Sequence, residues 1–167
     1  MKGMRMDISV QGIVGYQLST PEYGWLFMPF AGQTAPEKMP QDAVQSNKDD
    51  LDTQGSLVDY KLKGHTIELL GKEDVGGINC LKLKLTRKTS GVQTLYFDAN
   101  TYLVVRSITP QMANGATNEI VIDYADYKDV NGLKVPFILT TSNGTIMFSN
   151  IKINEIIDES LFAAPSN

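Results

Sequence analysis

The chain has 167 residues, of which 42% are hydrophobic and 20% charged, so the composition excludes wholesale disorder and allows a domain with a real core. The formal net charge of −4 argues against a nucleic-acid partner, because phosphate binding requires a basic face. No apolar run approaches the roughly 20 residues that a membrane helix needs, so no transmembrane segment is predicted.

The inventory of reactive side chains is small. Cys80 is the single cysteine and His65 the single histidine, and the sequence places no nucleophile beside His65. Neither a phosphate-binding glycine loop nor a zinc-protease or serine-hydrolase motif is present. We therefore expect no enzyme activity, no catalytic residue, no metal site and no cofactor.

The N-terminal part shows strand patterns. Residues 4–14 alternate between apolar and polar side chains, which is typical of a half-buried strand. A second strand is predicted over residues 16–18. Residues 24–28 are apolar on both faces, which indicates a covered strand or one that borders a cavity, and Pro29 ends its pairing.

Residues 31–64 are polar and rich in turn-forming residues. One weakly amphipathic helix is predicted over residues 41–51, and a second short helix from a cap at Ser56 to Gly64. We interpret residues 36–64 as a helical lid inserted into a single domain that spans residues 1–167. A linker between two domains is the alternative.

The remainder reads as a succession of strands joined by short turns. Three Asn-Gly steps, at 114–115, 131–132 and 143–144, are strong hairpin signals. Before, between and after them the apolar alternation predicts strands, the first over residues 66–70 and the last over residues 145–157. The chain is thus predicted to be mainly β, an antiparallel meander with a small helical insertion.

Bulky apolar residues are numerous: the chain has seven Met, six Phe, seven Tyr and one Trp. Such residues usually fill a core, but a curved sheet beneath a helical flap can instead leave a lined hollow. The residues expected at that junction form the predicted ligand-binding set: Trp25, Phe27, Phe30, Leu57 and Tyr60.

Several segments resemble the LolA/LolB-like family of outer-membrane lipoprotein-sorting proteins. The run Gly24-Trp25-Leu26-Phe27-Met28-Pro29-Phe30 is similar to the Trp-x-x-x-Pro-Phe strand of that family. Residues 57–75, 96–99, 126–137 and 157–165 follow in the same order as in the family's periplasmic branch. Only Trp25, Phe27 and Phe30 match the motif strand residue by residue.

This resemblance implies a strongly curved antiparallel sheet, a half-open barrel under a short helical lid. It also implies non-enzymatic binding of lipid or lipoprotein acyl chains in an apolar cleft, in the periplasm, for lipoprotein sorting. The alternative is an envelope sensor or scaffold module that uses the same fold to bind a protein partner; a hydrolase is the least favoured reading.

The start of the chain differs from the family pattern. Family members begin with a signal peptide, a long helix and further strands, which we expect to be missing ahead of Met1. Loss of those strands would leave an unpaired sheet edge near residues 4–14. Because exposed edges pair with other strands, a homo-oligomer through this edge is a further prediction.

Overall fold

The computed structural model describes residues 3–48, 51–88, 91–113 and 116–165. It is mainly β, as the sequence predicted, with 55% of the described residues in strands, and these strands form two antiparallel sheets. The chain divides into two compact units, Met1–Asp59 with Ile156–Asn167 and Tyr60–Glu155. The boundary falls within the predicted lid segment, and the single-domain organisation stays a prediction.

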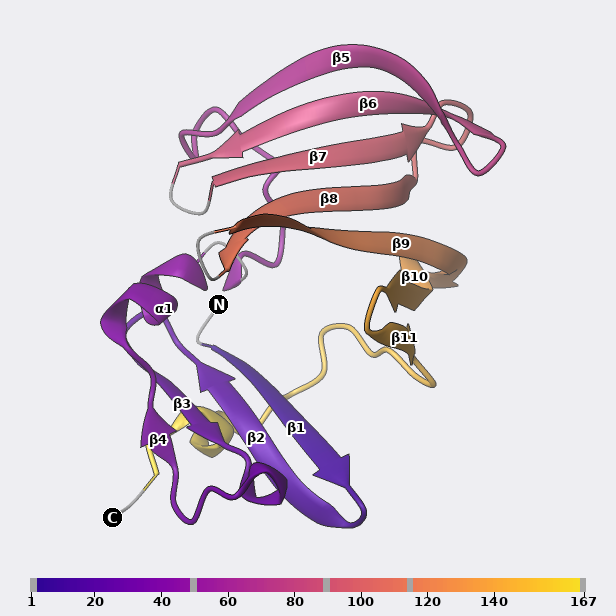
Figure 1. Ribbon diagram of the computed structural model, residues 1–167. Helices are drawn as coiled ribbons and strands as arrows, with labels where there is room; N and C mark the ends of the chain where they lie inside the picture. The colour runs from indigo at the N-terminus through magenta and orange to yellow at the C-terminus, as the bar shows by residue number, and fades with distance from the viewer. Residues whose placement is uncertain (1–2, 49–50, 89–90, 114–115, 166–167) are drawn as a thin grey trace. The chain divides into compact units, whose positions relative to one another are not determined.

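The first unit holds a four-stranded sheet in the order β1-β2-β3-β4 (Figure 1). A single strand over residues 4–14 was a wrong prediction, because Gln11 and Gly12, with φ of 51° and 82°, form a tight hairpin turn there. The strands are β1 (Met4–Val10), β2 (Ile13–Ser19), β3 (Gly24–Phe27) and β4 (Glu37–Lys38).

Short helical elements complete the first unit. The 3-10 turn η1 (Pro29–Ala31) follows β3, and α1 (Gln41–Ser46) is shorter than the predicted helix over 41–51. The C-terminal 3-10 turn η3 (Glu159–Phe162) returns to this unit, where the guanidinium of Arg5 donates to the carbonyl of Leu161 at 3.3 Å. Leu18, which is fully buried, forms the core with Val44 and Leu51.

The second predicted helix is absent from the described residues, which form consecutive turns over 56–63. Asp59 has a φ of 52°, which an α-helix does not accommodate. Leu62 is 88% exposed, so this segment has no buried apolar stripe. A helix this short needs such packing to form in water.

The second unit holds a seven-stranded sheet in the order β11-β10-β9-β8-β7-β6-β5, a simple antiparallel meander (Figure 1). Its strands are β5 (Thr66–Val75), β6 (Ile78–Arg87), β7 (Gly91–Asp98), β8 (Val104–Ala113), β9 (Ala116–Val130), β10 (Leu133–Thr141) and β11 (Gly144–Met147).

The turns of this sheet follow the sequence signals in part. The Asn131-Gly132 hairpin is confirmed, with φ of 52° and 85°, and a two-residue turn precedes Gly144. The Asn114-Gly115 step lies outside the described residues. The predicted strand over 145–157 is wrong beyond Met147. The amide of Phe148 still donates to the carbonyl of Phe137 on β10, but the described residues after it form no strand, and Asn154 adopts a φ of 62°.

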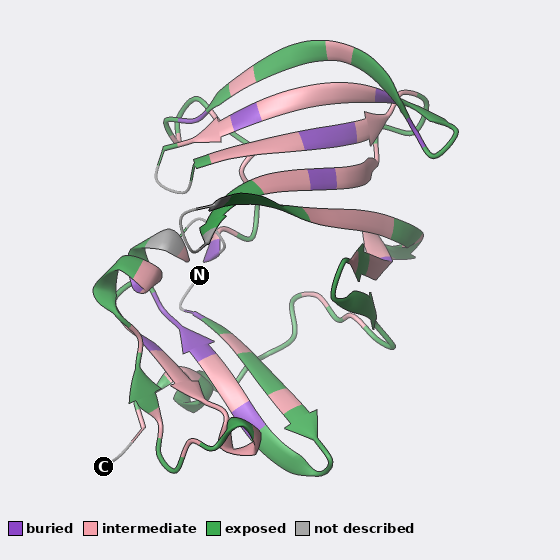
Figure 2. Cartoon of the chain, in the orientation of Figure 1, coloured by how far each residue is buried: buried purple, intermediate pink, exposed green. Residues whose placement is uncertain are grey.

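Cross-strand register sorts the side chains of the second sheet onto two faces. One row of directly paired residues is apolar apart from a serine: Leu69, Leu83, Leu95, Ser107 and Ile122. The adjacent row, which points to the opposite face, carries Lys82, Tyr96, Arg106 and Asp123. Figure 2 shows buried segments on the central strands β6, β7 and β8.

The apolar face gives a matched test of its contribution to stability. Leu85 is 1% exposed whereas Leu69, on the same face, is 64% exposed. We expect Leu85→Ala to lower the free energy of unfolding by about 2–5 kcal/mol, since a buried cavity remains. Leu69→Ala should change it by less than about 1 kcal/mol. Urea denaturation followed by circular dichroism measures both, and equal losses would contradict the difference in burial between the two leucines.

Candidate apolar binding site

The first unit carries four of the five predicted ligand-binding residues. Trp25 and Phe27 share one face of the sheet, where they pair with Leu18 and Tyr16 on β2. The rings of Tyr16 and Phe27 lie 5.9 Å apart between centroids. The Nε1 atom of Trp25 is buried and has no hydrogen-bond partner among the described atoms.

The other three predicted residues belong to other elements of the chain. Gly15 precedes Tyr16 on β2, so a side chain at Gly15 would point to the face opposite Tyr16, Trp25 and Phe27. A Cβ atom added at Gly15 would lie 2.9 Å from the ring of Phe30, so Phe30 covers that opposite face. Leu57 lies half-buried in the turns after α1, and Tyr60 belongs to the second unit. The five residues do not form one described site, and their role in ligand binding stays a prediction.

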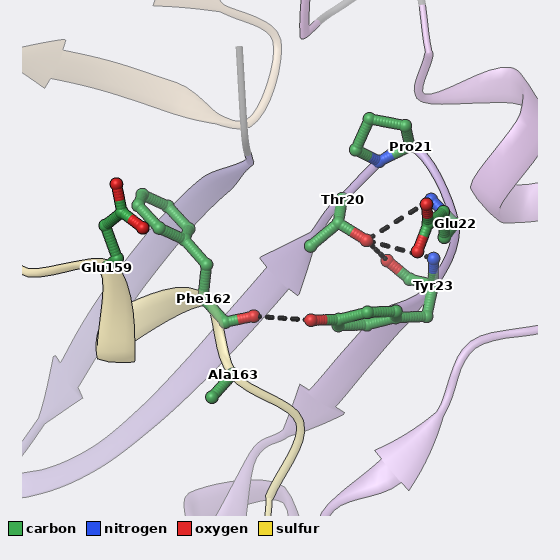
Figure 3. A pocket seen from close by; sticks show the side chains of 7 residues that line it. All are labelled: Thr20, Pro21, Glu22, Tyr23, Glu159, Phe162 and Ala163. Atoms are coloured by element: carbon green, nitrogen blue, oxygen red, sulfur yellow. Dashed lines mark hydrogen bonds between the residues drawn. The ribbon is translucent and has the colours of Figure 1, made fainter.

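A cavity of about 390 Å3 lies in the first unit, between the β2–β3 turn and the C-terminal turn (Figure 3). The hydroxyl of Tyr23 donates to the carbonyl of Phe162 at 2.7 Å and so joins the two walls. Thr20 Oγ1 donates to the carbonyl of Tyr23 and accepts from the amides of Glu22 and Tyr23, which fixes the turn.

This cavity is poorly suited to an apolar ligand. Two carboxylates, those of Glu22 and Glu159, stand among the residues that line it, and none of its described lining residues is basic. Burying a carboxylate beneath a hydrocarbon chain costs free energy unless the charge is paired. The hydrogen bond from Tyr23 to Phe162 across it instead holds the C-terminal turn on the four-stranded sheet.

A second cavity, of about 360 Å3, lies entirely within the second unit. Its walls are formed mainly by tyrosine rings and aliphatic groups from β7, β8, β9 and β10 and the loop before β8. The lining residues are Gln93, Leu95, Tyr102, Leu103, Val104, Tyr124, Tyr127, Lys134 and Pro136. We call this the tyrosine pocket.

Two departures from regular strand geometry shape the tyrosine pocket. The pairing shifts between Tyr96 and Phe97, so that Val104 pairs with Phe97 on the apolar face. On β9, Asp126 has a φ of 53°, which interrupts side-chain alternation. Tyr124 and Tyr127, three residues apart, both line the pocket as a result.

The hydroxyls of Tyr124 and Tyr127 both make hydrogen bonds within the protein. Tyr127 donates its hydroxyl to the carbonyl of Val104 at 2.7 Å, and the hydroxyls of Tyr124 and Ser107 lie 3.0 Å apart. Burial, together with the neighbouring Tyr124, raises the pKa of Tyr127 to about 12. At physiological pH the hydroxyl of Tyr127 is therefore uncharged, and the hydroxyls of Tyr124 and Tyr127 both have hydrogen-bond partners within the protein.

The sequence reasoning missed the tyrosine pocket although part of its signal was visible. Alternation placed Leu95 on an apolar face and Tyr124 with the isoleucines of its strand. It did not give the register between strands, and nothing local marked Tyr102 or Tyr127. The positive φ of Asp126 has no signal in the sequence beyond the tolerance of Asp for that conformation.

The described residues show little else that could support chemistry. No cluster of three or more His, Cys, Asp or Glu among them is placed to hold a metal ion. Cys80 is buried in β6, and desolvation, with smaller contributions from Asp98 and Asp74, raises the pKa of its thiol. In the part of the chain that the structure describes, no helix is long and apolar enough to cross a membrane.

Comparisons with known proteins identify structural relatives but no sequence family. No family model matches the chain, and no curated protein matches it. A LolA superfamily protein from Nitrosomonas europaea is similar in structure, with a TM-score of 0.58 and 14% identity over 92% of this chain and 72% of that one.

Two further solved structures are similar. One is described as an outer membrane lipoprotein-sorting protein domain from Vibrio parahaemolyticus, with a TM-score of 0.52 and 13% identity over 96% of this chain and 80% of that one. The other is a DUF1329 family protein from Desulfovibrio piger, with a TM-score of 0.54 and 13% identity over 96% and 88% of the two chains. The chain has a LolA-like fold, as the sequence resemblance implied.

The tyrosine pocket makes a prediction about alkaline pH. Because the folded-state pKa of Tyr127 lies near 12, above the ordinary value of about 10, its contribution to stability is present below pH 10. That contribution is lost as the pH rises from about 10 towards 12. In a pH titration, the tyrosinate absorbance of the wild type minus that of Tyr127→Phe reports the ionisation of Tyr127 alone. This difference should have its midpoint near pH 12, and a midpoint near pH 10 would contradict the buried environment of the Tyr127 hydroxyl.

Proposed function

We propose that this chain is a non-enzymatic binding protein that holds the acyl chain of a lipid or lipoprotein. The tyrosine pocket and the adjoining apolar face of the seven-stranded sheet are the proposed binding surface. The observation that carries the proposal is the composition of that surface: the transverse row Leu69–Leu83–Leu95–Ser107–Ile122 carries no charge, and the pocket walls are mostly rings and aliphatic groups.

The energetics of such a surface suit a hydrocarbon chain. Each methylene transferred from water to an apolar surface contributes about 0.8 kcal/mol. About ten methylenes would contribute about 8 kcal/mol before the loss of translational and conformational freedom is subtracted. Micromolar binding corresponds to a net gain of about 8 kcal/mol, and so it requires more than about ten methylenes to be covered.

The similarity of fold to a protein described as a lipoprotein-sorting domain supports a role in lipoprotein sorting, in the periplasm. Fold alone does not fix function, and so the pocket composition is the more direct support. The residues Trp25, Phe27, Phe30, Leu57 and Tyr60 stay proposed as ligand-binding residues, on the basis of the sequence.

A second candidate function is a module that binds a protein partner in the cell envelope. The two sheets end in edge strands, β1 and β11, which carry exposed apolar side chains such as Met6 and Met147. Edge strands with this character favour pairing with another strand.

The binding proposal predicts uptake of a fluorescent fatty-acid probe by the purified protein. Leu103→Asp, in the pocket wall, should weaken binding by about tenfold or more, because it would place a carboxylate against the chain. Leu133→Asp, at an exposed position outside the pocket, is the matched control and should bind as the wild type does.

The same titration tests the sequence-based residues. Trp25→Ala should reduce affinity if β3 forms part of the surface, and unchanged binding would remove Trp25 from the site. Failure of the wild type to take up the probe, in protein with a native circular dichroism spectrum, would contradict the function itself.

The edge strands predict self-association, as proposed from the sequence for the edge near residues 4–14. Light scattering after size exclusion should show a dimer, and Met6→Lys, on the β1 edge strand, should yield a monomer. Met147→Lys, on the edge strand β11 of the seven-stranded sheet, is the control and should leave the dimer intact. A stable monomer of the wild type at high concentration would contradict this proposal.

A further inference from the structure

The tyrosine pocket contains a single formal charge. Of the nine described residues that line it, only Lys134 is charged, and the others are apolar, aromatic or amide side chains. Lys134 is the second residue of β10 and has the same side-chain direction as Pro136, two residues along the strand. The lining of the pocket therefore has one cationic side chain among neutral, largely apolar ones.

The present partner of this ammonium holds it weakly. Lys134 pairs with Asp129 on β9, and its Nζ atom lies 3.5 Å from Asp129 Oδ2. Both side chains are more than half exposed, at 58% and 55%, and exposed pairs of this kind contribute about 0–1 kcal/mol. Asp129 is held separately, since its Oδ1 accepts the amide of Gly132 in the hairpin turn.

Lys134 can thus donate to an anion without dismantling the turn. An ammonium has three donors, and the contact with Asp129 is to one carboxylate oxygen, Oδ2. Tyr102, which is 69% exposed and also lines the pocket, stands where the pocket meets solvent. The deeper wall is formed by Leu95, which is buried, with Val104 beside it.

We propose that the tyrosine pocket takes a single-chain amphiphile with an anionic head group, its carboxylate or phosphate at Lys134 and its hydrocarbon chain against Leu95, Leu103 and Val104. This inference rests on the proposed acyl-chain function and adds the ligand class. The volume of about 360 Å3 is near the lower end of the range for small-molecule sites, roughly 300–1,000 Å3, and so favours one chain over several.

The test compares head groups on one hydrocarbon chain. Dodecanoate, dodecyl phosphate, dodecanol and dodecylammonium are titrated into the purified protein by calorimetry, each below its micelle concentration. We expect the two anions to bind about tenfold more tightly than dodecanol, a difference of about 1.4 kcal/mol, and dodecylammonium to bind least. The ratio of the two anions shows whether the site favours a carboxylate or a phosphate.

Substitutions of two lysines on the paired strands β9 and β10 distinguish a specific role of Lys134 from a general effect of positive charge. Lys134→Gln should remove the preference for anions while keeping dodecanol affinity. Lys128→Gln is the matched control: its ammonium lies over the ring of Phe137, 4.4 Å from the centroid, and it does not line the pocket. It should keep the preference.

The outcomes distinguish the two levels of proposal. If no amphiphile binds, the acyl-chain function itself fails. If all four bind with equal affinity, or if Lys134→Gln leaves the anion preference intact, the function stands and the assignment of an anionic ligand to Lys134 is overturned.

Discussion

Cross-strand register in the seven-stranded sheet is the constraint on which the proposed site depends. Neighbouring residues on each central strand face opposite ways, which separates an apolar row from a charged row. The apolar row contains Leu83, Leu95, Ser107 and Ile122, and the charged row contains Lys82, Tyr96, Arg106 and Asp123. A slip of one residue would exchange the two rows. The bidentate pair of Arg106 with Asp123 and the contact of Lys82 with Glu73 join neighbouring strands on the charged face and oppose such a slip.

The tyrosine pocket arises where this regular pattern is interrupted. The shift of register after Tyr96 and the positive φ of Asp126 bring side chains together that strict alternation would separate. The hydroxyl of Tyr127 then binds the carbonyl of Val104, which ties β9 to the start of β8. A regular sheet supplies the apolar surface, and its irregularities supply the hollow and the single ammonium at its border.

The sequence predicted the class of fold and most strands because alternation and Asn-Gly turns are local signals. It failed where local signals were ambiguous: Gln11-Gly12 is a less typical hairpin turn than Asn-Gly, and Val58 and Leu62 suggested a helix whose apolar side chains are exposed. The site was less predictable than the fold. Trp25 and Phe27 were correctly expected on a common strand. The pocket required the pairing of β7 to β10, which depends on contacts between residues far apart in the chain.

Photocrosslinking tests directly whether an acyl chain binds in the tyrosine pocket of the seven-stranded sheet. A fatty acid with a diazirine near its methyl end, bound to the protein and activated by light, marks the residues that surround the chain. We expect crosslinks on peptides that contain Leu95, Leu103 and Tyr124, and we expect excess unlabelled fatty acid to abolish them. Crosslinks confined to the first unit, or none that compete, would contradict a binding site on the seven-stranded sheet.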